Sequence, residues 1–210
     1  SASGEGSNAT GYEALASGEN SSAMGTMAHA TGQGTNAIGH EATASGLGAS
    51  AIGSYSFATG NLSNAMGVGA RSEGDASNAI GLIAQAEGDA SNAMGLYARS
   101  EADLTNAIGA GAYAYGTASN AIGVVAQSGG VASNAMGVYA RSEGDNSIAI
   151  GTESLAEGES SSAIGDGAYA EGNASTAVGF QATSSGTASN AFGHEADAIG
   201  RASLAAGTGA

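Results

Sequence analysis

The side chains that could carry acid–base or metal chemistry are few, with 3 histidines, 19 acidic residues and no cysteine in 210 residues. His29 and His40 are separated by eleven positions and His194 lies far from both, with no third ligand in the spacing of a zinc site. The lack of cysteine excludes a disulfide framework and a thiolate nucleophile. The sequence therefore predicts no catalytic residue, no metal site and no cofactor.

The acidic residues recur every 14 positions, in columns formed by Glu73, Glu87 and Glu101, by Asp75, Asp89 and Asp103, and by Glu143, Glu157 and Glu171. Carboxylates stacked in this way repel one another, which raises pKa values or attracts a divalent cation. The calcium-binding pattern G-G-x-G-x-D is absent, so a solvated acidic stripe is the expected outcome.

Aromatic residues add a second kind of candidate. Tyr113 and Tyr115 lie two positions apart, so both rings project from the same face of an extended segment. Exposed tyrosines often anchor protein contacts. The candidate ligand-binding residues are thus Tyr113, Tyr115, Glu73, Glu87 and Glu101.

Charge and composition exclude other partners. Four arginines and no lysine against 19 acidic residues give a formal net charge of −15. Nucleic acids and anionic lipid surfaces both require a basic face, so neither is an expected partner. No apolar run approaches the roughly 20 residues of a membrane span, and the first residues do not form a signal-peptide pattern.

An internal repeat positions these side chains. The sequence Ala-x-Gly recurs every 14 residues, as in Ala23-Met24-Gly25 and Ala37-Ile38-Gly39, and a second Gly follows seven residues later, except at Ala102. Both halves of the repeat alternate small and variable residues, as in Ser77-Asn78-Ala79-Ile80-Gly81, which is typical of a strand with one buried face. Two glycines per repeat argue against a coiled coil.

Each 14-residue repeat is therefore one coil of a parallel β-solenoid, with two short strands joined by two glycine-containing corners. Small residues such as Ser77, Ala79, Ala84 and Ala86 point inward. The fold class is all-β, a β-roll or β-solenoid of fifteen coils that forms a single domain over residues 1–210. Stacking at ~4.8 Å makes it a rod roughly 70 Å long.

A ladder of large apolar residues points outward from the first strand, beside a row of asparagines that includes Asn78 and Asn92. An exposed stripe of this length exceeds what a soluble monomer tolerates, so another copy of the chain is expected to cover it in a cyclic homo-oligomer. The ladder and expected interface consist of Met24, Ile38, Ile52, Met66, Ile80, Met94, Ile108, Ile122, Met136, Ile150, Ile164, Val178 and Phe192.

Asn146-Ser147-Ile148-Ala149-Ile150-Gly151 resembles the NSVAIG motif of trimeric autotransporter adhesin heads, and Ser160-Ser161-Ser162-Ala163-Ile164-Gly165 resembles it too. The resemblance covers the whole chain. It implies a left-handed parallel β-roll that is a homotrimer about the apolar ladder. It also implies a fragment of a longer fibre on a bacterial surface, anchored in the outer membrane through a C-terminal region that these 210 residues lack.

The function that follows is attachment to extracellular matrix (collagen, fibronectin or laminin) or to host cells. An enzyme is not expected, because corners of equal length provide no cleft. The alternative is a structural spacer or self-association segment that has no host ligand of its own. Uniform repeats favour the spacer, whereas a saturable interaction with a matrix protein would favour the adhesin.

Overall fold

A computed structural model describes all residues from Ser1 to Ala210. The chain divides into two compact units, unit 1 (Ser1–Leu104) and unit 2 (Thr105–Ala210), which are built from the same 14-residue coil. Each coil contains a three-residue strand, a first corner, a two-residue strand and a second corner. We call the sheet of three-residue strands the ladder sheet and the sheet of two-residue strands the polar sheet.

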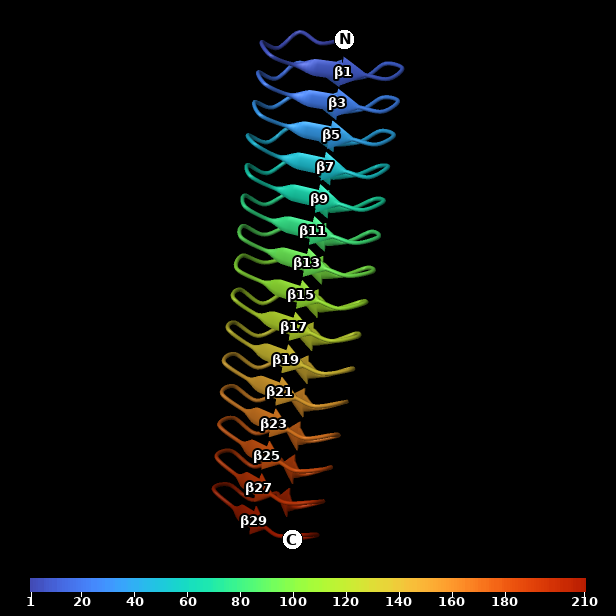
Figure 1. Cartoon of the computed structure of the whole chain (residues 1–210). Helices are drawn as coiled ribbons and strands as arrows, with labels where there is room; N and C mark the ends of the chain where they lie inside the picture. The colour runs from blue at the N-terminus through green and yellow to red at the C-terminus, as the bar shows by residue number, and fades with distance from the viewer. The chain divides into compact units, whose positions relative to one another are not determined.

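In unit 1 each strand pairs in parallel with the equivalent strand of the next coil, as in Asn78↔Asn92, Ala79↔Ala93 and Ile80↔Met94. Figure 1 shows β1 to β13 lying one above another, from blue to green. The ladder sheet comprises β1 (Asn8–Thr10), β3 (Ser22–Met24), β5 (Asn36–Ile38), β7 (Ser50–Ile52), β9 (Asn64–Met66), β11 (Asn78–Ile80) and β13 (Asn92–Met94). The polar sheet comprises β2 (Leu15–Ala16), β4 (His29–Ala30), β6 (Thr43–Ala44), β8 (Phe57–Ala58), β10 (Arg71–Ser72), β12 (Gln85–Ala86) and β14 (Arg99–Ser100).

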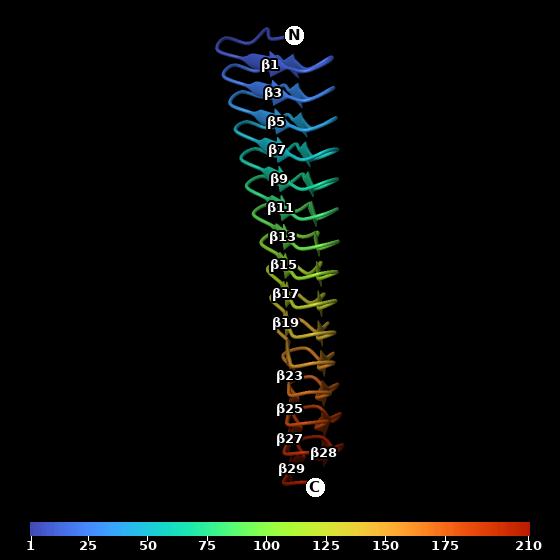
Figure 2. The same ribbon diagram turned by 45° about the vertical axis from the view of Figure 1, so that its right-hand side comes forward.

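Unit 2 repeats this arrangement with the same 14-residue register, as in Ile122↔Met136. In Figure 2, β28 lies beside the stack that holds β27 and β29, so the two sheets face each other. Its ladder sheet comprises β15 (Asn106–Ile108), β17 (Asn120–Ile122), β19 (Asn134–Met136), β21 (Ile148–Ile150), β23 (Ser162–Ile164), β25 (Thr176–Val178), β27 (Asn190–Phe192) and β29 (Leu204–Ala206). Its polar sheet comprises β16 (Tyr113–Ala114), β18 (Gln127–Ser128), β20 (Arg141–Ser142), β22 (Leu155–Ala156), β24 (Tyr169–Ala170), β26 (Thr183–Ser184) and β28 (Asp197–Ala198).

The core between the two sheets of each unit consists of Ala, Ser and Thr. Ser77, Ala79, Ala84 and Ala86 are all 0% exposed, as the alternating pattern predicts, and the largest fully buried side chain of unit 1 is Thr35. A Phe or Leu has no space here, since overpacking a close-packed interior costs about 1–3 kcal/mol. The small inward residues therefore determine the close approach of the two sheets.

Buried serines form hydrogen-bonded pairs across the core, five positions apart. The Oγ atoms of Ser72 and Ser77 are 2.6 Å apart, as are those of Ser142 and Ser147. Where the first member is Ala, the second often lacks a partner. The buried hydroxyls without a hydrogen bond, each five positions after an Ala, are those of Ser63, Ser91, Ser161, Ser175 and Ser203.

The glycines serve the corners in a way that the sequence only partly predicts. The first-corner Gly25 has φ +135°, as expected, and a Cβ there would lie 2.4 Å from the carbonyl oxygen of Gly39. The second-corner Gly18 does not have a left-handed φ. It is required because a Cβ would lie 1.9 Å from the carbonyl oxygen of Gly32. Conformational freedom therefore explains the first-corner glycine, whereas the close approach of the next coil's backbone explains the second-corner glycine.

Left-handed backbone does occur in both corners, but at the third residue, which is often not glycine. Met27 (φ 54°) and Tyr97 (φ 56°) occupy this position in first corners, and Asn20 (φ 53°) in a second corner. The conformation costs about 1–2 kcal/mol for a residue other than glycine. It is maintained because the amide of Met27 donates to the carbonyl of Tyr12 at 2.8 Å, and that of Asn20 to Glu5 at 2.7 Å.

The prediction of an all-β parallel β-solenoid with 14-residue coils is confirmed. The single domain over 1–210, the left-handed winding and the homotrimer remain predictions. The structure contains no helix of the length and apolar character needed to cross a membrane.

Candidate functional site

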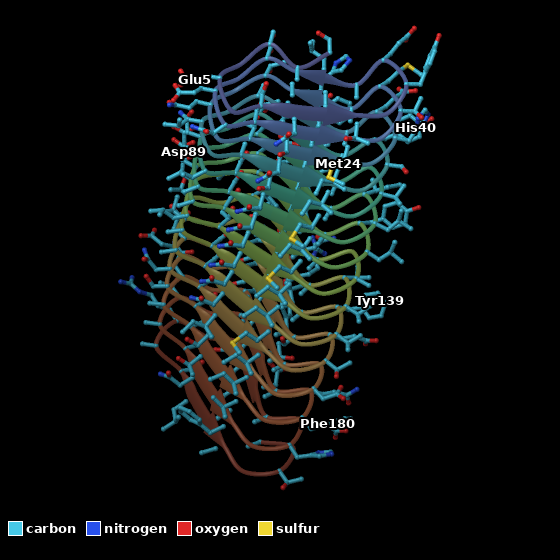
Figure 3. The ribbon with its side chains drawn as sticks, turned by 45° about the horizontal axis from the view of Figure 1, so that its top comes forward. Glu5, Met24, His40, Asp89, Tyr139 and Phe180 are labelled. Atoms are coloured by element: carbon cyan, nitrogen blue, oxygen red, sulfur yellow. The ribbon has the colours of Figure 1, made fainter.

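The apolar ladder is exposed on the ladder sheet of each unit. In unit 1 the exposed fraction of its six side chains runs from 37% at Ile52 to 49% at Met24. In unit 2, Ile108, Ile122, Met136, Ile150, Ile164 and Phe192 are exposed, and Val178 is half-buried. Figure 3 shows Met24 projecting from the strands, between the corner that holds Glu5 and Asp89 and the corner that holds His40. The ladder is thus available for contact with another molecule.

The asparagines beside the ladder form amide-to-amide hydrogen bonds along each stack. The Nδ2 of Asn64 donates to Oδ1 of Asn78 at 3.0 Å, and Asn78 donates to Asn92 at 2.9 Å. In unit 2, Asn106 donates to Asn120 at 2.7 Å. Because these side-chain amides hydrogen-bond to one another, we assign them a structural role.

An apolar extension of the ladder lies at the first corners, where the sequence places Tyr97 and Tyr139 beside the ladder. In unit 1, Leu82, Leu96 and Tyr97 are 46%, 44% and 57% exposed, and in unit 2 Val138 and Tyr139 are 40% and 53% exposed. Leu82, Leu96 and Val138 follow the corner glycine directly, and the two tyrosines are the next residues. From the sequence, Tyr97 and Tyr139 are predicted to be interface or edge residues, and Leu82, Leu96 and Val138 enlarge the same surface.

The polar sheet of unit 1 holds Arg–Glu ion pairs. Arg71 forms an ion pair with Glu73. Arg99 contacts Glu101 at 2.7 Å and Glu87 at 3.4 Å. All five side chains remain partly exposed, so each pair contributes about 0–1 kcal/mol. The candidate residues Glu73, Glu87 and Glu101 therefore lie on one face, partly neutralised by arginines.

In unit 2 the corresponding carboxylates also have partners. Arg141 forms an ion pair with Glu143, and the Tyr169 hydroxyl donates to Oε2 of Glu157 at 2.7 Å. Burial raises the pKa of Tyr169 to about 12, with further contributions from the hydrogen bond to Glu157 and the charges of Glu157 and Glu171. A phenol that stays protonated here donates to the carboxylate column.

The aspartate column has a structural role that differs from the expected acidic stripe. The Oδ1 of Asp75 accepts from the amide of Asn61 at 2.8 Å, Asp89 accepts from Asp75 at 2.8 Å, and Asp103 accepts from Asp89 at 2.9 Å. In unit 2, Asp145 accepts from the amide of Val131 at 2.8 Å. Each carboxylate thus accepts a hydrogen bond from a second-corner amide of the preceding coil and remains exposed.

Tyr113 and Tyr115 lie together on the polar sheet of unit 2, as the sequence predicts. Their ring centroids are 4.7 Å apart with an interplanar angle of 33°. The Tyr115 ring covers Gly129 of the next coil, where a Cβ would lie 2.4 Å from the ring. Tyr115 is exposed and Tyr113 is half-buried, and the role of the pair in binding remains a prediction.

The histidines lie at three separate places. His40 contacts Glu41 (Nε2–Oε1 3.2 Å) and packs edge-on against Tyr55. His194 lies 3.8 Å from Glu195 (Nδ1–Oε2) in the same Gly-His-Glu turn of unit 2 and stacks on Phe180 at 5.1 Å. Figure 3 shows His40 and Phe180 each at a corner. Side chains of His, Asp and Glu nowhere form a group of three suited to a metal ion.

His29 lines a shallow hollow in unit 1. The hollow has a volume of about 350 Å³. It lies between three successive first corners and three successive strands of the polar sheet, and its lining residues are Glu13, Met27, His29, Glu41, Thr43 and Phe57. The sequence analysis did not assign this site, although all six residues are aligned by the 14-residue register.

Comparison with known proteins identifies the repeat. The sequence model of the YadA head domain repeat matches residues 2–28, 16–35, 30–56, 129–154 and 156–182, which together span just over half of the chain. The crystal structure of the collagen-binding domain of the Yersinia adhesin YadA is 26% identical to this chain, with a TM-score of 0.33. That alignment covers 77% of this chain and 66% of the solved domain, so the chain spans just under two thirds of that domain's length. No curated protein matches the chain.

The coil and its surfaces define a class of protein, a parallel β-solenoid with repeated outward side chains. The matched repeats identify the family: the chain belongs to the YadA head domain family. It is thus an adhesin head, a non-enzymatic protein of bacterial surfaces, in agreement with the resemblance noted in the sequence.

Proposed function

We propose that this chain is the head of a homotrimeric bacterial adhesin, anchored in the outer membrane, that attaches the cell to extracellular matrix protein or to host cells. The observation that carries the proposal is the exposed apolar ladder on coils of an adhesin head family. The ladder supports assembly, and the family supports adhesion as the purpose of the assembled head.

Assembly through the ladder is supported by its chemistry. Aliphatic and thioether side chains in register on every coil provide a continuous apolar stripe beside an amide ladder that has its own hydrogen bonds. Surfaces of this kind rarely stay open to water on soluble proteins. No other segment of either unit packs on the ladder sheet's outer face, so a second and third copy of the chain are the partners of choice.

The polar sheet is the surface we assign to the ligand, with Tyr113 and Tyr115 in unit 2 and Glu73, Glu87 and Glu101 in unit 1 as contributors. The exposed side chains of a repeat provide many weak contacts, and three copies multiply them. Simultaneous engagement increases avidity without any strong single contact. Contacts that depend on exposed carboxylates weaken as salt rises.

The test has two parts. Sedimentation equilibrium of the 19.7 kDa chain is expected to give the mass of three copies, and a monomer at micromolar concentration would contradict the assembly. Binding of the assembled protein to immobilised collagen, fibronectin, laminin and itself is then measured at several salt concentrations. Collagen comes first among the probes because the Yersinia domain is described as collagen-binding.

Saturable, salt-sensitive binding to one matrix protein or to host cells is the expected result. The uniform 14-residue coils favour a second candidate, a spacer or self-association segment. Binding only to itself would indicate cell–cell aggregation, and folded trimers that bind none of the surfaces would favour the spacer.

A further inference from the structure

The hollow beside Phe57 is built by two columns of side chains. Glu13, Met27 and Glu41 are the third residues of three successive first corners, all with left-handed φ of 54–55°. The opposite wall is formed by outward residues of β4, β6 and β8, which pair in register from His29 to Thr43 to Phe57. The left-handed corner backbone projects its side chains over these strands and so encloses a space of about 350 Å³.

The charge around the hollow is negative. Residues 1–70 contain four glutamates and no lysine or arginine, and the first arginine of the chain is Arg71. Two of these glutamates, Glu13 and Glu41, line the hollow. Glu41 contacts His40 (3.2 Å), whereas Glu13 makes no ion pair. This differs from the coils around Arg71 and Arg99, where each glutamate of the polar sheet has an arginine beside it.

The apolar part of the hollow selects among cations. Phe57 is 39% exposed, and Met27, in the opposite wall of the hollow, is half-buried. A guanidinium group stacks on an aromatic face and binds a carboxylate with two parallel hydrogen bonds, which a compact ammonium group does less well. The methylene groups of an arginine side chain also pack against a thioether and a ring.

We propose that this hollow binds an arginine side chain of a protein ligand. The guanidinium stacks on Phe57 and pairs with Glu13 or Glu41, and the aliphatic part lies against Met27. The inference that the arginine belongs to a protein on the surface to which the cell attaches rests on the proposed function. The binding of arginine by the hollow is independent of that function.

The strand wall of the hollow stays open in the proposed trimer. Its strand residues lie on the polar sheet, whereas the ladder residues of the same coils, Met24, Ile38 and Ile52, lie on the ladder sheet. Figure 3 shows Met24 on the strands and His40 at the corner, on different faces of unit 1. Assembly through the ladder therefore leaves His29, Thr43 and Phe57 accessible.

The first experiment uses the whole ¹⁵N-labelled protein and a blocked arginine, Nα-acetyl-arginine methylamide. The blocked citrulline of the same shape and the blocked lysine are the comparison probes. We expect saturable shifts of the Glu13, His29 and Phe57 amides with arginine, and affinity at least about fivefold lower for citrulline, which lacks the charge. Equal affinity for arginine and citrulline would overturn the proposal.

Substitutions of the lining residues test whether arginine binds in the hollow. Glu13→Gln/Glu41→Gln is expected to reduce arginine affinity at least about tenfold, and Phe57→Leu to remove the preference for arginine over lysine. The matched control is Glu195→Gln, which follows His194 in unit 2 as Glu41 follows His40 but does not line the hollow. It should leave the shifts unchanged. Undiminished binding by the folded Glu13→Gln/Glu41→Gln variant contradicts the assignment.

The second experiment separates this inference from the proposed function. Wild type and Glu13→Gln/Glu41→Gln are compared on collagen and on collagen whose arginines have been modified with phenylglyoxal. Loss of binding with either change supports the inference. Equal binding of both proteins to both surfaces overturns the inference and leaves the adhesin intact. Saturable arginine binding without attachment to any matrix protein leaves the hollow assigned and contradicts the adhesin.

Discussion

The same substitution should have opposite effects on stability at two equivalent core positions, Ser77 and Ser91. Both side chains are 0% exposed and occupy the same place in successive coils of unit 1. The hydroxyl of Ser77 donates to the carbonyl of Gly74 at 2.6 Å and lies 2.6 Å from Oγ of Ser72. Since Ser77 has only one hydroxyl proton, Ser72 is the donor in that pair. Ser91 faces an alanine and has no hydrogen-bond partner.

The magnitude follows from these contacts. A buried polar group without a partner costs about 1–3 kcal/mol, so Ser91→Ala should raise the free energy of unfolding by about that amount. Ser77→Ala removes two hydrogen bonds and leaves the buried Ser72 hydroxyl without its acceptor. Its free energy of unfolding should therefore fall by about 2–4 kcal/mol. The sign of the change, more than its size, is the prediction.

The assay is urea unfolding followed by circular dichroism at one fixed protein concentration, because an oligomer's stability depends on concentration. Stacked repeats can open in segments, so local stability is also measured by amide hydrogen exchange. The amides of Asn64 and Asn78 are suitable reporters, since they donate to the carbonyls of Ser77 and Ser91 at 2.9 and 2.8 Å. Protection at Asn64 should fall in Ser77→Ala, and protection at Asn78 should rise in Ser91→Ala.

Ser72→Ala/Ser77→Ala is the control, because removal of both hydroxyls leaves no buried hydroxyl without a hydrogen-bond partner at that site. It should recover most of the loss of Ser77→Ala, which measures the coupling of the pair. A destabilising effect of Ser91→Ala would refute the reasoning. The Ser91 hydroxyl would then bond in solution to the carbonyl of Gly88, as Ser21 bonds to Gly18 at 2.7 Å.

The remaining predictions concern assembly, corners and titration. Ile108→Asp should weaken the trimer by about 3 kcal/mol or more, because it buries an unpaired charge, and an unchanged mass in sedimentation equilibrium would exclude Ile108 from the interface. Gly67→Ala should cost about 3 kcal/mol or more in urea unfolding, since φ is +138° and its Cβ would lie 2.3 Å from a backbone oxygen. Gly69→Ala should cost only about 1–2 kcal/mol, since its φ of +66° is left-handed but its Cβ would meet nothing closer than 3.4 Å, and equal losses would contradict this account of the corners. The pKa of Tyr169 is raised from 10.0 to about 12, so the folded state holds this proton more tightly. Its contribution to stability is present below pH 10 and lost as the pH rises towards 12, and Glu157→Gln should lower the pKa in a titration of tyrosinate absorbance.

Much of the coil was predictable because each position of the repeat has one dominant constraint. Alternation assigns Ala79 and Ala86 to the core, and both are fully buried. The large side chain between Ala79 and Gly81 could only point outward, and Ile80 does, at 38% exposed. Fixed spacing also predicts the amide ladder, because residues 14 apart stack on adjacent strands.

The corners were less predictable because their geometry depends on the neighbouring coil. Gly18 looks like a turn glycine in the sequence, yet its constraint is a carbonyl oxygen 14 residues away. The left-handed position is filled by residues as different as Met27 and Ala90, so it leaves no pattern of residue type. The Asp75 carboxylate likewise appeared to be part of a charged stripe, whereas a corner amide accounts for it.

These constraints indicate which positions of the coil are available for recognition. Inward and glycine positions are fixed by packing, and the ladder is fixed by the proposed assembly. The corner side chains and the outward residues of the polar sheet remain free to vary, because they contact solvent. In the coils around Arg71 and Arg99, arginine and glutamate side chains at these positions form ion pairs with each other. The coils that contain Glu13 and Glu41 leave carboxylates beside an exposed ring. A cationic ligand therefore gains most from the coils before Arg71, and binding should be sought there first.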